Sequence, residues 1–221
     1  MATSTVENYL KTMLQLDEGS GISVGAIAES LEVTPGTVSS MMRHLASEGL
    51  IDYIPRRSVN LLPKGRTQAL KVVRRHRIIE TYLVEVMKLD WSEVHEEAEV
   101  LEHVISDRLL GRMDEMLGFP SHDPHGDPIP DREGNVATQE ALLPLSDAGP
   151  GKYRIVRVSD SDSGFLDWLR DHRLLPGSEF EIQEHDPVAG IIEIQLAGEF
   201  PPLRLGEKAA VRILVERTGG N

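Results

Sequence analysis

Near the middle of the chain lies the run His95-Glu96-Glu97-Ala98-Glu99-Val100-Leu101-Glu102-His103, inside a segment without Gly or Pro from Met87 to Leu110. Such a segment favours a helix. At about 100° per residue, a helix gathers two histidines and two glutamates within roughly 100° of arc: His95, Glu99, Glu102 and His103. A separate apolar stripe remains for core packing: Val94, Ala98, Leu101 and Ile105.

This polar face has the donor atoms of a metal site. Imidazole nitrogens and carboxylate oxygens are the ligands of divalent first-row metals. The alternative is an acidic face that is simply solvated. A second pair, His76 and Glu80, repeats the same chemistry at i,i+4 spacing in the preceding helical segment. The repetition favours two helices that hold metal together.

Composition limits the class of protein. The chain has 221 residues and 40% hydrophobic residues, enough for one to three small domains. It contains no cysteine, which excludes disulfides, thiolate zinc sites and cysteine nucleophiles. No apolar run approaches the ~20 residues of a membrane span. The first residues, Met1-Ala2-Thr3-Ser4, do not resemble a signal peptide, so we expect a cytoplasmic protein without membrane contact.

Charge is unevenly distributed along the chain. The net charge is −13, yet the segment from Arg43 to Arg75 carries a local balance of +6, leaving −19 for the rest. Such asymmetry is typical of a protein with one basic surface for a polyanion. The alternative is chance clustering on a solvated face.

The N-terminal third has the pattern of a winged helix–turn–helix. Apolar spacing and capping residues predict helices over residues 7–17, 24–31 and 35–47. Two strands follow, over residues 50–54 and 58–62, with the basic tip Pro55-Arg56-Arg57 between them. In this motif the third helix enters the major groove of DNA. The alternative is a three-helix domain used for protein contacts.

We expect the small polar residues at the start of the third helix to face the bases: Thr34, Pro35, Gly36, Thr37, Ser39 and Ser40. Arg43 comes one turn later, where phosphate contact is expected. Arg56 and Arg57 on the wing are placed to meet phosphates or the minor groove.

The middle of the chain predicts a homodimer. A long helix is expected over residues 64–88, the central helix to about Leu110, and a shorter piece over 112–117. These helices are too few for an independent core, so we expect a seam between two copies, with these candidates: Ile78, Ile79, Tyr82, Leu83, Val86, Val104 and Leu109. A dimer also suits a palindromic operator in double-stranded DNA.

The last third reads as a small β-barrel. A Pro-rich turn at 121–130 carries Asp123 and His125, and 131–150 resembles a linker. Strands are then expected over residues 153–158, 180–184, 190–196 and 209–215, with a short helix over 164–172.

The chain resembles the diphtheria toxin repressor family of metal-dependent transcription regulators, and most closely its manganese-responsive branch. The resemblance covers essentially the whole chain and is carried by these motifs: Glu7-Asn8-Tyr9-Leu10-Lys11, Thr34-Pro35-Gly36-Thr37-Val38-Ser39, Arg75-His76-Arg77-Ile78-Ile79-Glu80, the run from His95 to His103, and Pro124-His125-Gly126-Asp127-Pro128-Ile129-Pro130.

The resemblance implies a mainly α fold with a small β part. It consists of a winged helix–turn–helix DNA-binding domain (residues 1–63), a helical dimerisation and metal-binding domain (64–140), a linker (141–151) and an SH3-like, FeoA-like β-barrel (152–217).

The resemblance also implies two metal sites per subunit. One maps to Asn8, Glu99, Glu102 and His103. The other maps to His76, Glu80, His95, Asp123, His125 and Asp160, and the sequence leaves open which of these bind together. Asp162 is an alternative to Asp160 as a ligand of the second site. In the first site, Glu7 or a water molecule is an alternative to Asn8.

Two departures bear on the metal. Iron-responsive members carry a cysteine where Glu99 stands, and a harder oxygen ligand shifts the preference toward Mn²⁺, with Fe²⁺ as the alternative. Many relatives have aspartate or methionine where this chain has Asn8, so the first site loses a negative charge.

The expected function is a metal-loaded repressor of metal-uptake genes, not an enzyme. The central run reads His-Glu-Glu-Ala-Glu rather than the His-Glu-x-x-His of zinc proteases. The alternative is a winged-helix regulator that senses a small organic ligand without metal control.

Overall fold

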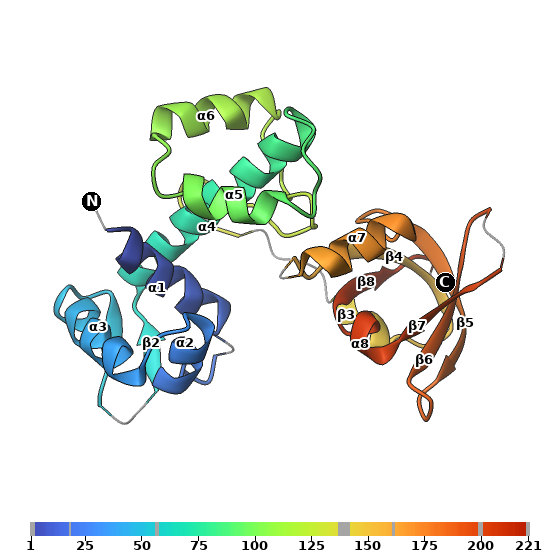
Figure 1. The fold of residues 1–221 in the computed structure, drawn as a ribbon, viewed down its shortest axis with the longest axis horizontal. Coiled ribbons are helices and arrows are strands. Elements are labelled where there is room, and N and C mark those ends of the chain that lie inside the picture. Colours follow the sequence, from blue (N-terminus) through green and yellow to red (C-terminus); the bar gives the residue numbers. More distant parts are fainter. Residues whose placement is uncertain are drawn as a thin grey trace. The chain divides into compact units, whose positions relative to one another are not determined.

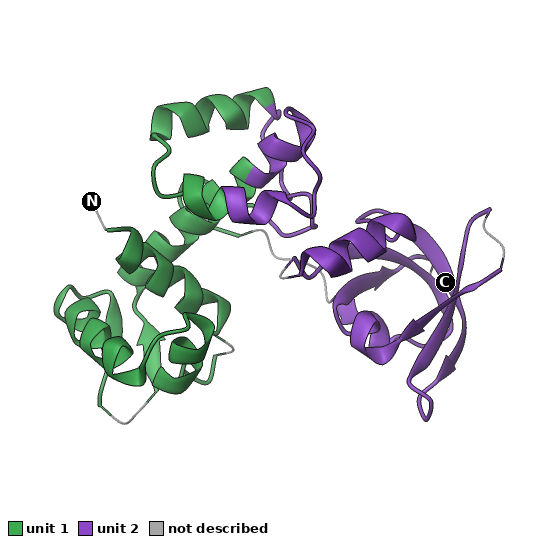
Figure 2. Ribbon diagram, viewed as in Figure 1, with its two compact units in different colours: residues 1–79, 98–116, 129–136 green, residues 80–97, 117–128, 137–221 purple. Residues whose placement is uncertain are grey.

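The computed structural model describes residues 3–17, 19–55, 58–136, 142–160, 162–198 and 201–219. The chain forms two compact units, coloured separately in Figure 2. The first contains Met1–Ile79, Ala98–Met116 and Ile129–Val136, and the second Glu80–Glu97, Leu117–Pro128 and Ala137–Asn221.

The N-terminal part of the first unit is a winged helix–turn–helix (Figure 1), as predicted. It consists of α1 (Ser4–Gln15), α2 (Val24–Ser30), α3 (Pro35–Ser47), β1 (Ile51–Tyr53) and β2 (Val59–Leu61). The two strands pair antiparallel, with Ile51 opposite Leu61. The core between the helices is fully buried and consists of Leu10, Met13, Ile27, Val38, Met42 and Leu45.

Capping explains why the prediction for α3 was accurate at both ends. The Thr34 hydroxyl accepts a hydrogen bond from the Thr37 N–H at 3.2 Å, and Pro35 occupies the first helical position. Gly49, with φ of +69°, takes the left-handed conformation just after the helix.

The helical part contains α4 (Pro63–Glu85), α5 (Val94–Leu101) and α6 (Asp107–Met116). The predicted long helix agrees with α4. The prediction of a central helix reaching Leu110 was wrong, because α5 ends at Leu101 and α6 begins only at Asp107. Among the described residues, no helix is long and apolar enough to cross a membrane.

Two contacts account for this break. The Glu102 carbonyl, which would continue the helix, accepts a hydrogen bond from the Arg75 guanidinium at 3.2 Å. The Ser106 hydroxyl then accepts from the Leu109 N–H at 3.2 Å and starts a new helix. Glu102 and His103 therefore lie in a turn after α5, not on a helical face.

Part of the predicted dimer seam was also wrong. Ile78, Ile79 and Leu83 are buried within the chain itself and cannot face a second copy. Three other candidates are exposed, namely Val86, Val104 and Leu109. Further exposed apolar residues occur at Val100, Met116 and Phe119.

The second unit contains the barrel: β3 (Leu143–Pro144), η1 (Leu145–Asp147), β4 (Gly151–Val158), α7 (Ser163–Asp171), β5 (Glu179–Asp186), β6 (Ile191–Leu196), β7 (Leu203–Gly206), α8 (Glu207–Ala210) and β8 (Ile213–Arg217). Its six strands form one antiparallel sheet in the order β3-β8-β4-β5-β6-β7. Figure 1 shows the curvature of this sheet, and the apolar core of the unit includes side chains from β4, β5, β6 and β8. The domain begins earlier than predicted, because β3 and η1 precede residue 152.

The prediction of one strand over residues 209–215 was wrong. Ala209 and Ala210 end α8, Val211 and Arg212 form a turn, and only Ile213 onward is strand. Alanine is the strongest helix former, and Ala210 is fully buried at this corner of the barrel.

A glycine in the first turn of α4 provides a test of the packing in the first unit. A Cβ at Gly65 would lie 2.1 Å from the Leu50 carbonyl oxygen, whereas a Cβ at Gly25, in the first turn of α2, would meet only the Ser23 hydroxyl at 3.7 Å. We expect Gly65→Ala to lower the melting temperature and Gly25→Ala to leave it unchanged or raise it, since alanine is favoured over glycine in helices by up to about 1 kcal/mol. Equal effects of the two substitutions in thermal unfolding would contradict this close approach.

Candidate metal centres

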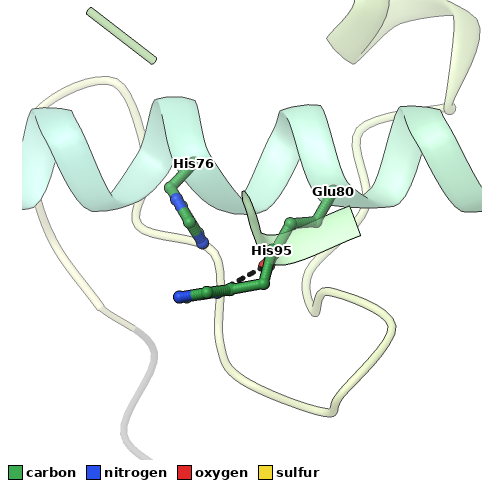
Figure 3. Close-up of side chains that lie close together, drawn as sticks. All are labelled: His76, Glu80 and His95. Carbon is green, nitrogen blue, oxygen red and sulfur yellow. Dashed lines mark hydrogen bonds and ion pairs between the residues drawn. The ribbon is translucent and has the colours of Figure 1, made fainter. Parts of the chain in front are cut away.

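Helix α4 carries two of the predicted ligands one turn apart. His76 and Glu80 project from the same side of the helix, and His95 of α5 lies next to Glu80 (Figure 3). Glu80 is fully buried and His76 is 5% exposed. Buried ionisable groups need compensating charges or hydrogen bonds, and each of these residues has such partners.

In the first unit, Glu102 is the centre of one cluster, which we call the Glu102 cluster. It comprises Glu7, Lys11, Arg75, His76, Glu99, Glu102 and His103. The Glu102 carboxylate is fully buried. Its Oε2 lies 2.6 Å from His76 Nδ1 and 2.9 Å from Lys11 Nζ. Ligand atoms of His76, Glu99 and Glu102 lie within 4.8 Å of one another, a spacing that suits one metal ion.

His103 is oriented by a carboxylate of α1. Its Nδ1 lies 2.8 Å from Glu7 Oε2, and since a carboxylate only accepts, Nδ1 carries the hydrogen. The other carboxylate oxygen of Glu7 accepts from Arg75 at 3.0 Å. His103 Nε2 is buried, makes no hydrogen bond to the described residues, and lies 3.5 Å from Glu102 Oε1. In the neutral imidazole this nitrogen presents a lone pair beside a carboxylate, as a metal ligand does.

Asn8 lies on α1 between Glu7 and Lys11. Its side-chain Oδ1 is buried and makes no hydrogen bond to the described part of the chain. Residues three apart share a helix face, so Asn8 lies on the same side of α1 as Lys11. A buried carbonyl oxygen in this position fits the predicted role of Asn8 as a ligand.

In the second unit, Glu80 is the centre of the Glu80 cluster, formed by Glu80, His95, Asp123, His125 and Asp160. Glu80 Oε1 lies 3.2 Å from His95 Nδ1, and Asp160 Oδ2 lies 3.8 Å from the same nitrogen. Ligand atoms of Glu80, Asp123 and His125 lie within 4.8 Å of one another, and all three residues are buried.

His125 shows the same arrangement as His103. Its Nε2 donates to the Trp91 carbonyl at 3.0 Å, and its ring stacks on the Trp91 indole with centroids 5.3 Å apart. Its Nδ1 is buried, has no hydrogen-bond partner in the described structure, and lies 3.9 Å from Glu80 Oε2. An oriented imidazole that faces a buried carboxylate with its lone pair fits a divalent metal.

The loop that presents these residues is built by Asp123. Its Oδ1 accepts hydrogen bonds from the backbone N–H groups of His125 and Asp127, both at 2.9 Å. Gly126 has φ of +90°, and a Cβ there would lie 1.9 Å from the Val156 carbonyl oxygen. Only glycine allows this approach, and the His125 carbonyl in turn accepts from the Val158 N–H of β4 at 2.9 Å.

An open acidic pocket of about 730 Å³ leads to this cluster, lined by Leu89, Ser92, Glu93, His95, Glu96, Glu97, Asp160, Asp162 and Ser163. Within it, Asp162 has a structural role. Hydrogen bonds from Arg212 and from the Phe165 N–H hold the pKa of Asp162 below its ordinary value. Because Asp162 caps α7 in this way, Asp160 is the better candidate ligand of the two.

The predicted DNA-contacting residues gather at the start of α3. Five of these residues are exposed, namely Thr34, Pro35, Gly36, Thr37 and Ser40. Ser39 is half-buried, and its hydroxyl donates to the Pro35 carbonyl. Arg43 is exposed one turn later. The wing residues Arg56 and Arg57 lie outside the described residues.

Sequence reasoning missed Lys11 and Arg75 as members of the Glu102 cluster. Lys11 is four residues after Glu7, and Arg75 directly precedes His76, so both positions were visible. The sequence did not show where these two side chains point, because that depends on how α1 packs against α4 and the α5–α6 turn.

Comparisons with known proteins identify the domains of the chain. Residues 1–59 match the family described as "Iron dependent repressor, N-terminal DNA binding domain", residues 62–131 its "metal binding and dimerisation domain", and residues 143–217 the "FeoA domain". The diphtheria toxin repressor of Corynebacterium diphtheriae is 36% identical over 193 residues, covering 82% of this chain and 85% of that protein. The iron-dependent repressor IdeR of Mycobacterium leprae is 37% identical over 164 residues, covering 72% and 67%.

Solved structures are similar over nearly the whole chain. A manganese-dependent transcriptional repressor in complex with manganese has a TM-score of 0.89 and 37% identity, covering 96% of this chain and 100% of that one. ScaR with bound Zn²⁺ has a TM-score of 0.80 and 31% identity, covering 96% and 99%.

The Asp123 turn provides a test of the loop. The segment Asp131–Asn135 has the same turn, in which Asp131 Oδ1 accepts from the Glu133 and Asn135 N–H groups at 2.9 and 2.7 Å, but it is exposed. We expect Asp123→Ala to cost about 1–3 kcal/mol of stability, because it leaves buried N–H groups unsatisfied. Asp131→Ala should cost less, because water replaces the lost acceptor. Urea unfolding of the metal-free proteins measures both, and a larger loss for Asp131→Ala would overturn the explanation.

Proposed function

The chain belongs to the diphtheria toxin repressor family of metal-dependent, DNA-binding repressors, and we propose that it responds to Mn²⁺, with Fe²⁺ as the alternative, and represses genes of metal uptake. Its similarity to the manganese-dependent repressor supports this choice of metal. The absence of cysteine from the sequence supports it too, since all candidate ligands are oxygen and nitrogen atoms, which suit Mn²⁺.

One observation carries the proposal. His103 and His125 each use one ring nitrogen to bind an acceptor and direct the other, buried and without a hydrogen bond to described residues, toward a glutamate. This repeated arrangement, one in each unit, supports two metal sites per subunit. We assign Asn8, Glu99, Glu102 and His103 to one site, and Glu80, His95, Asp123, His125 and Asp160 to the other. His76, one turn before Glu80 on α4 and bonded to Glu102, can contribute to either.

The Glu102 cluster connects metal binding to DNA binding. Glu7 and Lys11 belong to α1, which packs against α2 and β2 of the DNA-binding domain. Both contact residues of α4 and of the α5–α6 turn. A divalent cation would supply positive charge to the carboxylates of this cluster when bound. The contacts between α1 and α4 would then differ in free energy with and without the cation. This difference would shift the population toward arrangements that can bind DNA.

The exposed start of α3 is the proposed base-reading surface, and Arg43 the proposed phosphate contact. A homodimer formed through the dimerisation domain would present two such helices to a palindromic operator. We place this action in the cytoplasm, together with the DNA. Two open pockets, one beside the Glu80 cluster and one beside Glu7 and His103, are lined largely by polar side chains, which does not favour an apolar organic ligand there.

Metal dependence is tested by DNA binding to upstream regions of metal-transporter genes, with Mn²⁺ or with chelator. We expect Mn²⁺ to tighten binding by about tenfold or more, equivalent to about 1.4 kcal/mol of coupling. Glu102→Gln should lose this response, whereas Glu115→Gln, an exposed glutamate of α6 paired with Arg112, should keep it. Equally tight binding by the wild type in chelator would reject metal control.

The phosphate contact is tested by salt dependence. Arg43→Ala should weaken binding to all DNA sequences alike and reduce the slope of log affinity against log salt by about one. Arg204→Ala is the matched control, since Arg204 is an exposed arginine of β7 paired with Glu193. If both variants keep the wild-type slope, Arg43 does not touch the DNA backbone.

A further inference from the structure

Lys11 is a buried lysine in the first unit whose ammonium group lies between two carboxylates and beside a histidine ring. The residue is 6% exposed. Its Nζ lies 2.7 Å from Glu99 Oε1 and 2.9 Å from Glu102 Oε2. His76 Nδ1 is 3.1 Å away, but it lies 2.6 Å from Glu102 Oε2 and carries the hydrogen of that contact, since a carboxylate only accepts. A buried ammonium is costly unless it is paired and hydrogen-bonded, and here its neighbours meet that requirement.

The same three neighbours form the group that suits a metal ion. Ligand atoms of His76, Glu99 and Glu102 lie within 4.8 Å of one another. The lysine ammonium therefore lies among the oxygen and nitrogen atoms that would coordinate a cation. An ammonium and a metal ion cannot use these lone pairs at the same time, because both require the same atoms at close range.

Charge explains why a lysine is stable in this position. Glu7 is already paired with Arg75, so Glu99 and Glu102 are the carboxylates left for Lys11 to balance. Without a cation between them, the two carboxylates would repel each other in a buried place. The Glu99 side chain is 39% exposed, so the cluster has a solvent-facing side. Lysine has a flexible stem, which allows its head group to leave while α1 stays intact.

We propose that Lys11 is the built-in cation of the metal-free repressor and that a divalent metal ion must displace its ammonium group to bind Glu99, Glu102 and His76. This inference rests on the proposed metal-dependent function and deepens it. Lys11 has two effects. It keeps the acidic cluster paired when metal is scarce, and it raises the metal concentration at which the cluster fills.

The first test compares full-length wild type with Lys11→Met, which keeps an unbranched side chain, one atom shorter, and removes its charge. We expect calorimetric titration with Mn²⁺ to show binding about tenfold tighter or more in the variant, because a competing positive charge is gone. We expect its metal-free melting temperature to fall, because Glu99 and Glu102 lose the ammonium group that both contact. Lys11→Arg keeps the charge and should not tighten binding. Lys208→Met, on α8, is the matched control.

A second measurement needs no substitution. Brief acetylation of the wild-type protein, read by mass spectrometry, reports how accessible each lysine amine is. We expect the acetylation rate of Lys11 to rise severalfold when Mn²⁺ is added, while that of Lys208 stays constant. A Lys11 that remains protected at saturating Mn²⁺ would show that its ammonium is not displaced, and would overturn the proposal even if Lys11→Met failed to fold.

The outcomes separate this inference from the proposed function. If wild type and Lys11→Met bind Mn²⁺ with the same affinity, metal dependence stands and the proposed role of Lys11 is rejected. Weaker binding by Lys11→Met also rejects it, since Lys11 would then assist the metal. Failure of both proteins to bind Mn²⁺ rejects both proposals. Binding by the variant that exceeds that of the wild type supports the inference.

Discussion

The structure of the first unit depends on a carboxylate that has been removed from water. Glu102 is fully buried, and a charge in that position is stable only when oppositely charged or hydrogen-bonding groups surround it. Lys11 and His76 supply those groups, and both are far from Glu102 in sequence. Satisfying this one group thus brings α1, α4 and the α5–α6 turn together. A DNA-binding helical domain and a metal-binding domain consequently share a single polar centre.

Local patterns predicted the parts of the fold whose causes are local. The bounds of α3 followed from Thr34 and Pro35 at its start and Gly49 after its end. The break between α5 and α6 did not follow, because it depends on Arg75 binding the Glu102 carbonyl, a contact between residues 27 positions apart. The candidate ligands could be listed from the sequence, since histidines and glutamates recur in short runs, and their role as ligands stays a prediction. The residues that surround each candidate ligand could not be predicted from the sequence, because they depend on how the helices and loops pack together.

Two turns of the same kind show how burial changes the role of one local structure. The segments Asp123–Asp127 and Asp131–Asn135 both fold around an aspartate that accepts two backbone N–H bonds. Only Asp123 is buried beside a histidine and a glutamate, so only its turn also brings ligand atoms together. The aspartate that both segments share therefore explains their common turn, whereas the burial of Asp123 beside His125 and Glu80 explains why only one of them forms a candidate metal site.

The contact between Trp91 and His125 has an optical consequence. Trp91 stacks on the His125 ring, and its own carbonyl orients that ring toward Glu80. The indole is thus in direct contact with an imidazole whose electronic state changes when its lone pair is used. The only other tryptophan in the sequence, Trp168, stacks on His172, which is not a candidate ligand. The protein therefore contains a natural fluorophore at the Glu80 cluster and a second one that serves as its internal reference.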